Sequence, residues 1–132
     1  MIRAMKIISH GIDLVDCARL QESIDRQGDR FLNRIFTESE REYCLGRKKG
    51  QIQSFAGRFA VKEAVMKVLG TGWAKGIAWT DIEVRNETNG RPVLCLHGEC
   101  RRIAEDMGIE EIHISISHTE THAVGSAVGT GG

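Results

Sequence analysis

The stretch SFAGRFAVKEAVMKVL, residues 54–69, decides the fold of this chain. Placed at 100° per residue, Phe55, Phe59 and Met66 share one face of a helix, and small or branched apolar residues cover most of the remainder. A helix without a continuous polar side is buried, and Gly70 follows its last apolar residue as a stop signal. The sequence therefore predicts a long central helix against which the rest of the chain packs.

The charged residues of this helix form two pairs on opposite flanks of its aromatic face. Arg58 is four residues from Lys62, and Glu63 is four residues from Lys67, a spacing that brings side chains together on a helix. Charged groups on a buried helix cost free energy unless a partner or a ligand neutralises them. These four residues are therefore candidates for chemistry as well as for structure.

Strand signals lie on both sides of the central helix. Residues 5–15 are rich in β-branched residues, although Gly11 and Asp13 interrupt the run, and Asn89-Gly90 suits the turn of a hairpin. The predicted strands cover residues 5–15, 82–85, 92–97, 112–118 and 124–128. Most of them are expected to pair antiparallel.

Shorter helices complete the pattern. Residues 16–28 alternate apolar and charged residues at helical spacing, and Thr37 with Glu40 forms a capping box that opens a helix through about Leu45. A further helix is expected over residues 99–107, and the glycine-rich residues 129–132 are expected to fray. We therefore predict a single α+β domain over residues 1–132, with a mostly antiparallel sheet packed on the long buried helix.

Composition narrows the class of function. The 132 residues include 18 Lys and Arg against 18 Asp and Glu, so no overall field marks a nucleic-acid or membrane-surface binder. We expect a cytoplasmic protein, since the chain shows no signal-peptide pattern and no apolar run of the ~20 residues that a membrane span needs. Its four cysteines include no Cys-x-x-Cys pair, and the Cys95–Cys100 spacing is a poor zinc signal, so inert reduced thiols are expected.

Asp13 and Glu63 are the strongest candidates for chemistry. Each carboxylate lies in an apolar segment, where its desolvation is costly unless a cation is present. Two carboxylates with phosphate oxygens and water suit Mg²⁺, and Lys67 on the same helix face as Glu63 can neutralise charge on a phosphoryl group. The alternative is a structural Glu63–Lys67 ion pair, which is common and worth only about 0.3–0.5 kcal/mol.

Basic residues offer contacts for a phosphate-containing ligand. Arg58, Lys62 and the loop Arg47-Lys48-Lys49 carry the charges and forks that suit phosphate oxygens, although the loop alone can equally be a solvated surface. Two further segments carry weaker signals, the turn at Asn89, Gly90, Arg91 and Pro92, and the strand end at Ser115, His118 and Thr119.

The motifs together resemble the holo-acyl-carrier-protein synthase family. The matching segments are GIDLV at residues 11–15, the Phe31, Arg34, Thr37 and Glu40 pattern, AGRFAxKEAxxK at residues 56–67, and SISHT at residues 115–119. The resemblance extends over nearly the whole chain. It implies a small enzyme that transfers 4′-phosphopantetheine from coenzyme A to a serine of acyl carrier protein, with magnesium, and releases adenosine 3′,5′-bisphosphate. The implied role is in fatty acid biosynthesis.

The resemblance also implies roles for individual residues. Asp13 and Glu63 become the magnesium ligands, and Lys67 stabilises the transferring phosphoryl group; Glu63 or a metal-bound water takes the serine proton. The coenzyme-binding positions implied are Arg58, Asn89, Gly90, Arg91, Pro92, Ser115, His118 and Thr119, and less specifically Lys48 and Lys49. Arg19, Arg26 and Arg30 are implied to bind the acidic carrier protein, although neighbouring acidic residues dilute this basic face.

The family's small members imply a homotrimer with active sites at subunit interfaces. Small-residue faces on the strands at residues 112–117 and 124–128 suit such packing. Two other functions remain open from the residues themselves, a magnesium-dependent phosphohydrolase and a trimeric nucleotide-binding module without catalysis.

Overall fold

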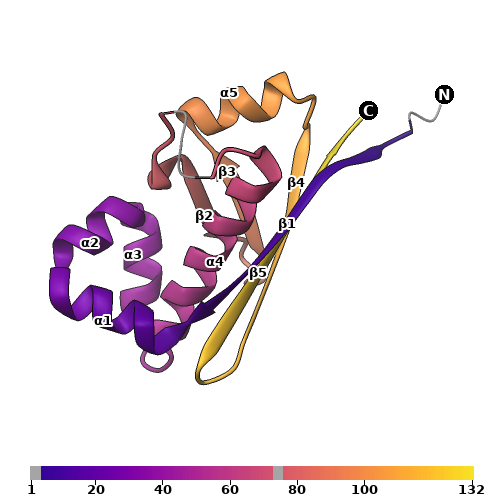
Figure 1. Ribbon diagram of the computed structural model, residues 1–132. Coiled ribbons are helices and arrows are strands. Elements are labelled where there is room, and N and C mark those ends of the chain that lie inside the picture. Colours follow the sequence, from indigo (N-terminus) through magenta and orange to yellow (C-terminus); the bar gives the residue numbers. More distant parts are fainter. Residues whose placement is uncertain (1–3, 73–75) are drawn as a thin grey trace.

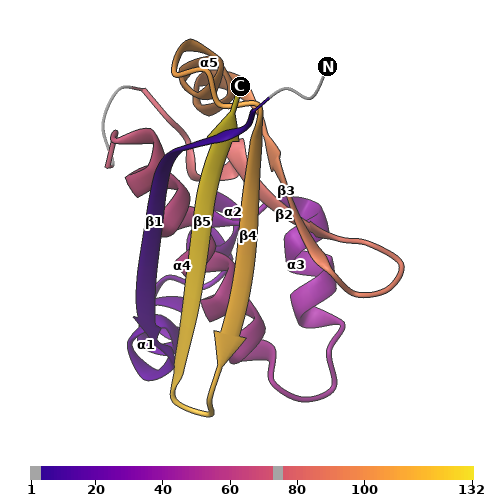
Figure 2. The ribbon, with the colours of Figure 1, turned by 90° about the vertical axis from the view of Figure 1, so that its right-hand side faces the viewer.

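The computed structural model describes residues 4–72 and 76–132 of the chain. Helix α4 (Gln51–Leu69) lies against one face of an antiparallel sheet with strand order β1-β5-β4 (Figure 1, Figure 2). The strands are β1 (Lys6–Asp16), β4 (Glu111–His118) and β5 (His122–Gly131). The expected α+β arrangement with a long helix on an antiparallel sheet is confirmed.

Helix α4 is buried as its sequence predicts. Phe55, Met66 and Val68 are each at most 3% exposed, and the alanines of the helix are fully buried against the sheet and the smaller helices. The helix starts three residues earlier than the apolar pattern indicates, at Gln51. The Gln51 side chain donates hydrogen bonds to the carbonyls of Leu45 and Arg47, which secures this polar first turn.

Three helices cover one end of α4. They are α1 (Cys17–Gln27), α2 (Asp29–Ile35) and α3 (Glu38–Leu45), and α1 and α3 match the sequence prediction. Asp16 caps α1, and Thr37 with Glu40 forms the expected capping box of α3. Helix α2 was not predicted from the sequence. Its seven residues are too few to show a helical repeat of apolar positions, and no side chain caps its first turn.

A separate hairpin lies beyond the β4 edge of the main sheet. Strands β2 (Ile82–Asn86) and β3 (Pro92–Leu96) pair only with each other, after a short 3₁₀ helix η1 (Trp79–Asp81) and before α5 (Gly98–Asp106) (Figure 2). The predicted turn is confirmed, since Asn86 pairs with Pro92 and Gly90 has φ +88°. The β structure is thus divided into two sheets.

Strand β1 continues through Gly11 and Asp13. A Cβ atom at position 11 would lie 2.3 Å from the Ala64 carbonyl oxygen and 2.9 Å from Lys67 Cβ, so glycine lets β1 approach α4 closely. Gly11 therefore continues the strand and brings the backbone next to Asp13 against the flank of α4 that carries Lys67.

The expected fraying of residues 129–132 is wrong. Gly129, Thr130 and Gly131 belong to β5, where Thr130 pairs with Glu111 on β4 and Gly131 pairs with Lys6 on β1. A Cβ atom at Gly131 would lie 2.0 Å from the Gly108 carbonyl oxygen, so the glycines allow close packing here. Pairing on both sides offsets the entropy that these glycines lose.

The face of the main sheet away from α4 is uncovered within the described chain. Ile7, Ile12 and Leu14 of β1 are 71%, 60% and 66% exposed. The neighbouring strands add further side chains to this same face. They are the half-buried Val124 and Val128 of β5 and the exposed Ser115 of β4. No helix among the described residues is long and apolar enough to cross a membrane.

Candidate functional site

The three strongest sequence candidates meet where β1 packs on α4. Lys67 Nζ lies 3.0 Å from Asp13 Oδ1 and donates a second hydrogen bond of 2.7 Å to the Ile12 carbonyl. Glu63 lies one turn before Lys67 on α4, close enough to Asp13 for the two carboxylates to repel each other. The structure thus brings Asp13, Glu63 and Lys67 together, and Lys67 forms its ion pair with Asp13.

The charged form of the Glu63 carboxyl group is disfavoured by its surroundings. Burial raises the pKa of the Glu63 carboxyl group, the negative charge of Asp13 raises it further, and Lys67 lowers it only in part. Two mutually repelling carboxylates in a partly desolvated position favour a bound cation or a proton.

This donor set fits magnesium better than a metal held by protein alone. Mg²⁺ commonly binds one or two carboxylates and fills its remaining positions with water and phosphate oxygens. Residues 4–72 and 76–132 contain no group of three or more His, Cys, Asp or Glu side chains suited to holding a metal. The four cysteines form no disulfide bonds. Burial is the main cause that raises the pKa of the Cys100 thiol to about 12, which agrees with the expectation of an inert thiol.

Arg58 forms a second cluster on the other flank of α4. Its side chain is 5% exposed, its guanidinium lies 4.1 Å from the centre of the Tyr43 ring, and Nη2 donates to Asn86 Oδ1 on β2. Arg58 Nε is buried without a hydrogen-bond acceptor among the described residues. An arginine held in this way keeps donor capacity for an anion.

The hairpin turn and the basic loop lie beside this cluster. Asn86 Nδ2 donates to the Gly90 carbonyl at 3.0 Å, and the Arg91 amide donates to Asn89 Oδ1 at 2.9 Å, which fixes the turn before Pro92. A separate recess of about 640 Å³ is lined by Tyr43, Gly46, Arg47, Lys48 and Lys49.

The candidates at the end of β4 are exposed. Ser115 and His118 have exposed side chains, and His118 Nδ1 lies 3.3 Å from the Thr119 carbonyl oxygen. Thr119 closes the β4–β5 turn, where its amide donates to the His122 carbonyl at 2.8 Å. A larger recess of about 750 Å³ between β3, α5 and β4 includes Arg91 and Pro92 and none of the other candidates.

The candidate residues of one chain form two groups at opposite edges of the main sheet. Asp13 lies on the edge strand β1, and Gly11 packs on α4 beside Lys67. At the other edge Ile116 of β4 packs on Gly57, next to Arg58 and the hairpin (Figure 2). A single chain therefore does not bring the two groups together.

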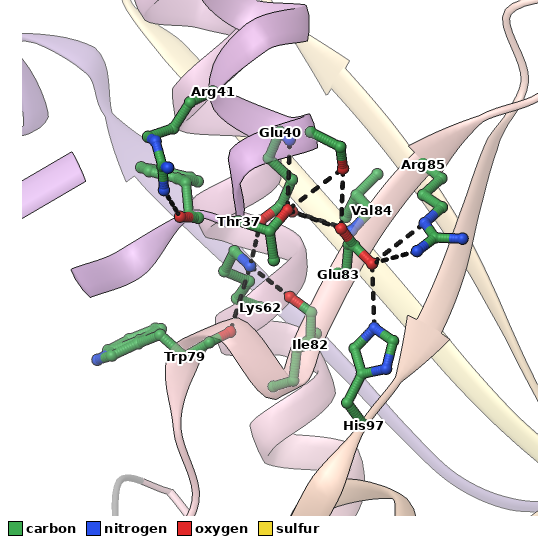
Figure 3. A network of polar contacts seen from close by, with 12 residues as sticks. Thr37, Glu40, Arg41, Lys62, Trp79, Ile82, Glu83, Val84, Arg85 and His97 are labelled. Carbon is green, nitrogen blue, oxygen red and sulfur yellow. Dashed lines mark hydrogen bonds and ion pairs between the residues drawn. The ribbon is translucent and has the colours of Figure 1, made fainter. Parts of the chain in front are cut away.

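Lys62 is not available to a ligand, contrary to the sequence-based suggestion that it binds phosphate. It is fully buried, its Nζ lies 2.8 Å from Glu40 Oε1, and it also donates to the carbonyls of Trp79 and Ile82 (Figure 3). In the sequence Glu40 stands out as a capping residue and as part of the family pattern, and nothing in either role connects it with Lys62. The two lie 22 residues apart in the chain, so no local period could reveal the pair.

The three candidate docking arginines are exposed on the helical end of the molecule. Arg19 and Arg26 lie on α1, while Arg30 lies on α2. Helix α1, which carries Arg19 and Arg26, follows directly on the end of β1 beyond Asp13 (Figure 1).

Known proteins resemble the chain in sequence and in structure. The family model of the 4′-phosphopantetheinyl transferase superfamily matches residues 9–124. A holo-[acyl-carrier-protein] synthase from Koribacter versatilis is 46% identical over 122 residues, which cover 92% of this chain and 97% of that protein. A holo-(acyl-carrier-protein) synthase from Bacillus anthracis in complex with CoA (3′,5′-ADP) matches with a TM-score of 0.78 and 37% identity, over 98% of this chain and 100% of that one. The Helicobacter pylori holo-[acyl-carrier-protein] synthase in complex with coenzyme A matches with a TM-score of 0.79 and 31% identity, over 91% and 98% of the two chains.

Proposed function

Because the chain belongs to the 4′-phosphopantetheinyl transferase superfamily, and within it to the holo-[acyl-carrier-protein] synthases, we propose how it acts on its substrates. It transfers 4′-phosphopantetheine from coenzyme A to a serine hydroxyl of acyl carrier protein. The observation that carries this proposal is the meeting of Asp13, Glu63 and Lys67 between β1 and α4. The match with this chain extends over nearly the whole length of relatives that are named holo-acyl-carrier-protein synthases.

Asp13 and Glu63 hold magnesium in this proposal. When bound, the ion supplies positive charge to the diphosphate of coenzyme A. Lys67 would donate to a non-bridging oxygen of the phosphoryl group, since its side chain is 53% exposed and its ammonium group lies beside Asp13.

The transfer is a displacement at the β-phosphorus of coenzyme A. The serine oxygen forms a bond to phosphorus while the bond to the oxygen shared with the α-phosphate breaks, and adenosine 3′,5′-bisphosphate leaves with the electron pair. The raised pKa of Glu63 makes it a candidate to accept the hydroxyl proton. This chemistry supports fatty acid biosynthesis in the cytoplasm.

The active site is completed by a neighbouring copy in a homotrimer. One chain holds the metal group at the β1 edge, and the coenzyme-binding group, with Arg58 and the hairpin turn, is at the other edge. The uncovered sheet face, with Ile12 and Leu14 more than half exposed, offers the apolar surface that such an assembly would bury. Arg19, Arg26 and Arg30 then guide the acidic carrier to the metal group.

A mass measurement tests the activity. The chain is incubated with coenzyme A, magnesium and apo-acyl carrier protein, and the carrier is weighed. A transferase adds the phosphopantetheine mass to the carrier serine. A phosphohydrolase consumes coenzyme A and leaves the carrier unchanged, and a binding module changes neither; both outcomes would reject the proposal.

A further inference from the structure

The hairpin β2–β3 has few backbone hydrogen bonds to its surroundings. Among residues 4–72 and 76–132, the Ile82 amide of β2 donates to the Trp79 carbonyl of the adjacent η1, and no backbone–backbone hydrogen bond joins β2 or β3 to an α-helix or to the main sheet. The hairpin carries Asn86, the partner of Arg58, and the turn with Asn89 and Arg91. Side chains must therefore determine where this half of the candidate site lies.

A buried ion pair makes the connection. Glu40, at the start of α3, accepts from the Val84 amide of β2 at 2.9 Å through Oε2 and from Lys62 at 2.8 Å through Oε1 (Figure 3). Lys62, on α4, also donates to the carbonyl of Ile82 on β2 and, at 3.2 Å, to the carbonyl of Trp79. The pair thus binds the backbone of β2 on both sides of residue 83.

Glu83 adds a third connection between β2 and α3. Its Oε2 accepts hydrogen bonds from Thr37 Oγ1 at 2.7 Å and Ser39 Oγ at 2.8 Å. Three consecutive residues of β2 are thus held by directional hydrogen bonds. Asn86 follows only two residues later, about 7 Å further along the strand.

A buried ion pair is a poor source of stability alone. Glu40 and Lys62 are both fully buried, and burial lowers the pKa of the Lys62 ammonium while Glu40 opposes that shift. Removing two charges from water costs much of what their attraction returns. Apolar packing by Ile82 and Val84 holds β2 on the core, but such contacts tolerate sliding, whereas hydrogen bonds to backbone atoms fix one position.

We propose that Glu40 and Lys62 are positioning residues for coenzyme A, fixing the hairpin relative to α4 so that Asn86, Arg58 and the turn before Pro92 are aligned for the nucleotide. This inference rests on the proposed function for the identity of the ligand. The pair touches neither coenzyme A nor the reacting atoms. It acts through the position of β2.

The test compares Glu40→Gln with a variant of matched stability. A glutamine at position 40 keeps the shape, but its amide cannot accept both from Lys62 and from the Val84 amide through separate oxygens. Leu32→Ala on α2 removes apolar packing from a buried position outside the network and serves as the control. Lys62→Met is the second network variant. Thermal unfolding establishes that the compared variants are folded.

Coenzyme A binding is measured by calorimetry, and the transfer assay gives KM and kcat. We expect Glu40→Gln and Lys62→Met to weaken coenzyme A binding about tenfold and to raise its KM, because a misplaced binding group loses most of its contribution. The KM for the carrier and the kcat at saturation should change by less than about twofold. Leu32→Ala should leave coenzyme A binding unchanged, and an equal weakening in this control would overturn the proposal.

Amide hydrogen exchange gives a readout that needs no ligand. The amides of Val84, Glu87 and His97, in or beside the hairpin, should exchange faster in Glu40→Gln than in Leu32→Ala. Equal exchange in the two variants would overturn the positioning role, even if Glu40→Gln binds coenzyme A poorly. If the unaltered chain binds no coenzyme A, the proposed function fails, while hydrogen exchange still decides whether the pair positions the hairpin.

Discussion

Lys67 holds Asp13 across the contact between α4 and β1, with 3.0 Å between Nζ and Oδ1. The ammonium thus stands beside the carboxylate at which a metal ion is proposed to bind. Glu63 completes the group, and the attraction of Lys67 offsets only part of the burial and of the repulsion from Asp13 that raise the pKa of its carboxyl group. This arrangement predicts how each carboxylate responds to substitution.

Replacing Glu63 by Gln is expected to abolish transfer and to leave the fold intact. The neutral side chain no longer repels Asp13 and no longer needs desolvation, so the variant should unfold at the same temperature as the original chain or higher. The mass assay and thermal unfolding check this together. If more magnesium restores the rate, Glu63 acts as a metal ligand. If the rate is not restored at saturating magnesium, Glu63 is still a candidate for the base that accepts the serine proton. Activity near that of the unaltered chain would contradict the assignment.

The magnesium requirement is expected to increase as the pH falls. Since burial and Asp13 raise the pKa of Glu63, a proton competes with the metal for this carboxylate at higher pH than for an ordinary glutamate. When transfer rates are measured over a series of pH values, the half-saturating magnesium concentration should rise as the pH is lowered. A requirement that does not change with pH would show that Glu63 is not protonated in competition with the metal.

Glu83 is expected to contribute stability that acid removes. Desolvation alone would raise its pKa, but hydrogen bonds from Thr37, His97 and Ser39 lower the pKa to about 2. A carboxyl group whose pKa is lower in the folded state than in the unfolded state stabilises the fold at pH values above the unfolded pKa, here near 4.5. This contribution is lost as the pH falls toward the folded pKa of about 2.

Glu83→Gln should therefore lower the free energy of unfolding at pH 7 by roughly 2 kcal/mol. This value is reduced for solvent screening, because His97 and Arg85, which both pair with the Glu83 carboxylate, are largely exposed (Figure 3). Urea unfolding at a series of pH values should show the difference from the unaltered chain shrinking below about pH 4. Glu105→Gln, which removes an exposed ion pair with Arg101, is the control and should have little effect. An equal loss at pH 7 and pH 3 would mean that packing, not charge, is responsible.

Arg19→Glu is expected to weaken the use of the carrier protein and to spare coenzyme A. The side chain is exposed on α1, away from the coenzyme-binding group, so reversing its charge changes the field that guides an acidic partner. The KM for the carrier should rise several-fold, less so at high salt, because screening at 0.15 M acts over about 8 Å. Arg101→Glu on α5 is a matched control. If the KM values for both substrates rise together, α1 is not the docking surface.

Two inactive variants are expected to restore activity when mixed. In a trimer with shared sites, an Asp13→Ala chain supplies Arg91, and an Arg91→Ala chain supplies Asp13. After unfolding and refolding in equal amounts, about a quarter of the sites should be intact. Sedimentation measures the assembly in parallel. A mixture no more active than the average of its components, or a fully active monomer, would reject the shared site.

The sequence predicts the features that depend on neighbouring residues better than those that depend on residues far apart in the chain. Periodicity identified α4, and a capping box identified α3, because both signals lie within a few residues. The apolar surroundings of Asp13 and Glu63 mark both as candidates in the sequence, and the structure places the two carboxylates close enough to repel each other. The Glu40–Lys62 pair could not be predicted in this way, because its burial depends on η1 and β2, which reach it from distant parts of the chain. The tail shows the reverse error, since glycines that favour disorder in isolation are ordered by strands on both sides.

The division of the β structure into two sheets makes the chain an unusually good subject for redesign. The turn between β2 and β3 can be lengthened, shortened or exchanged without breaking a hydrogen-bonded ladder of the main sheet, since none crosses between them. Libraries that vary residues 87–91 would explore new donor molecules while Asp13, Glu63 and Lys67 keep their geometry.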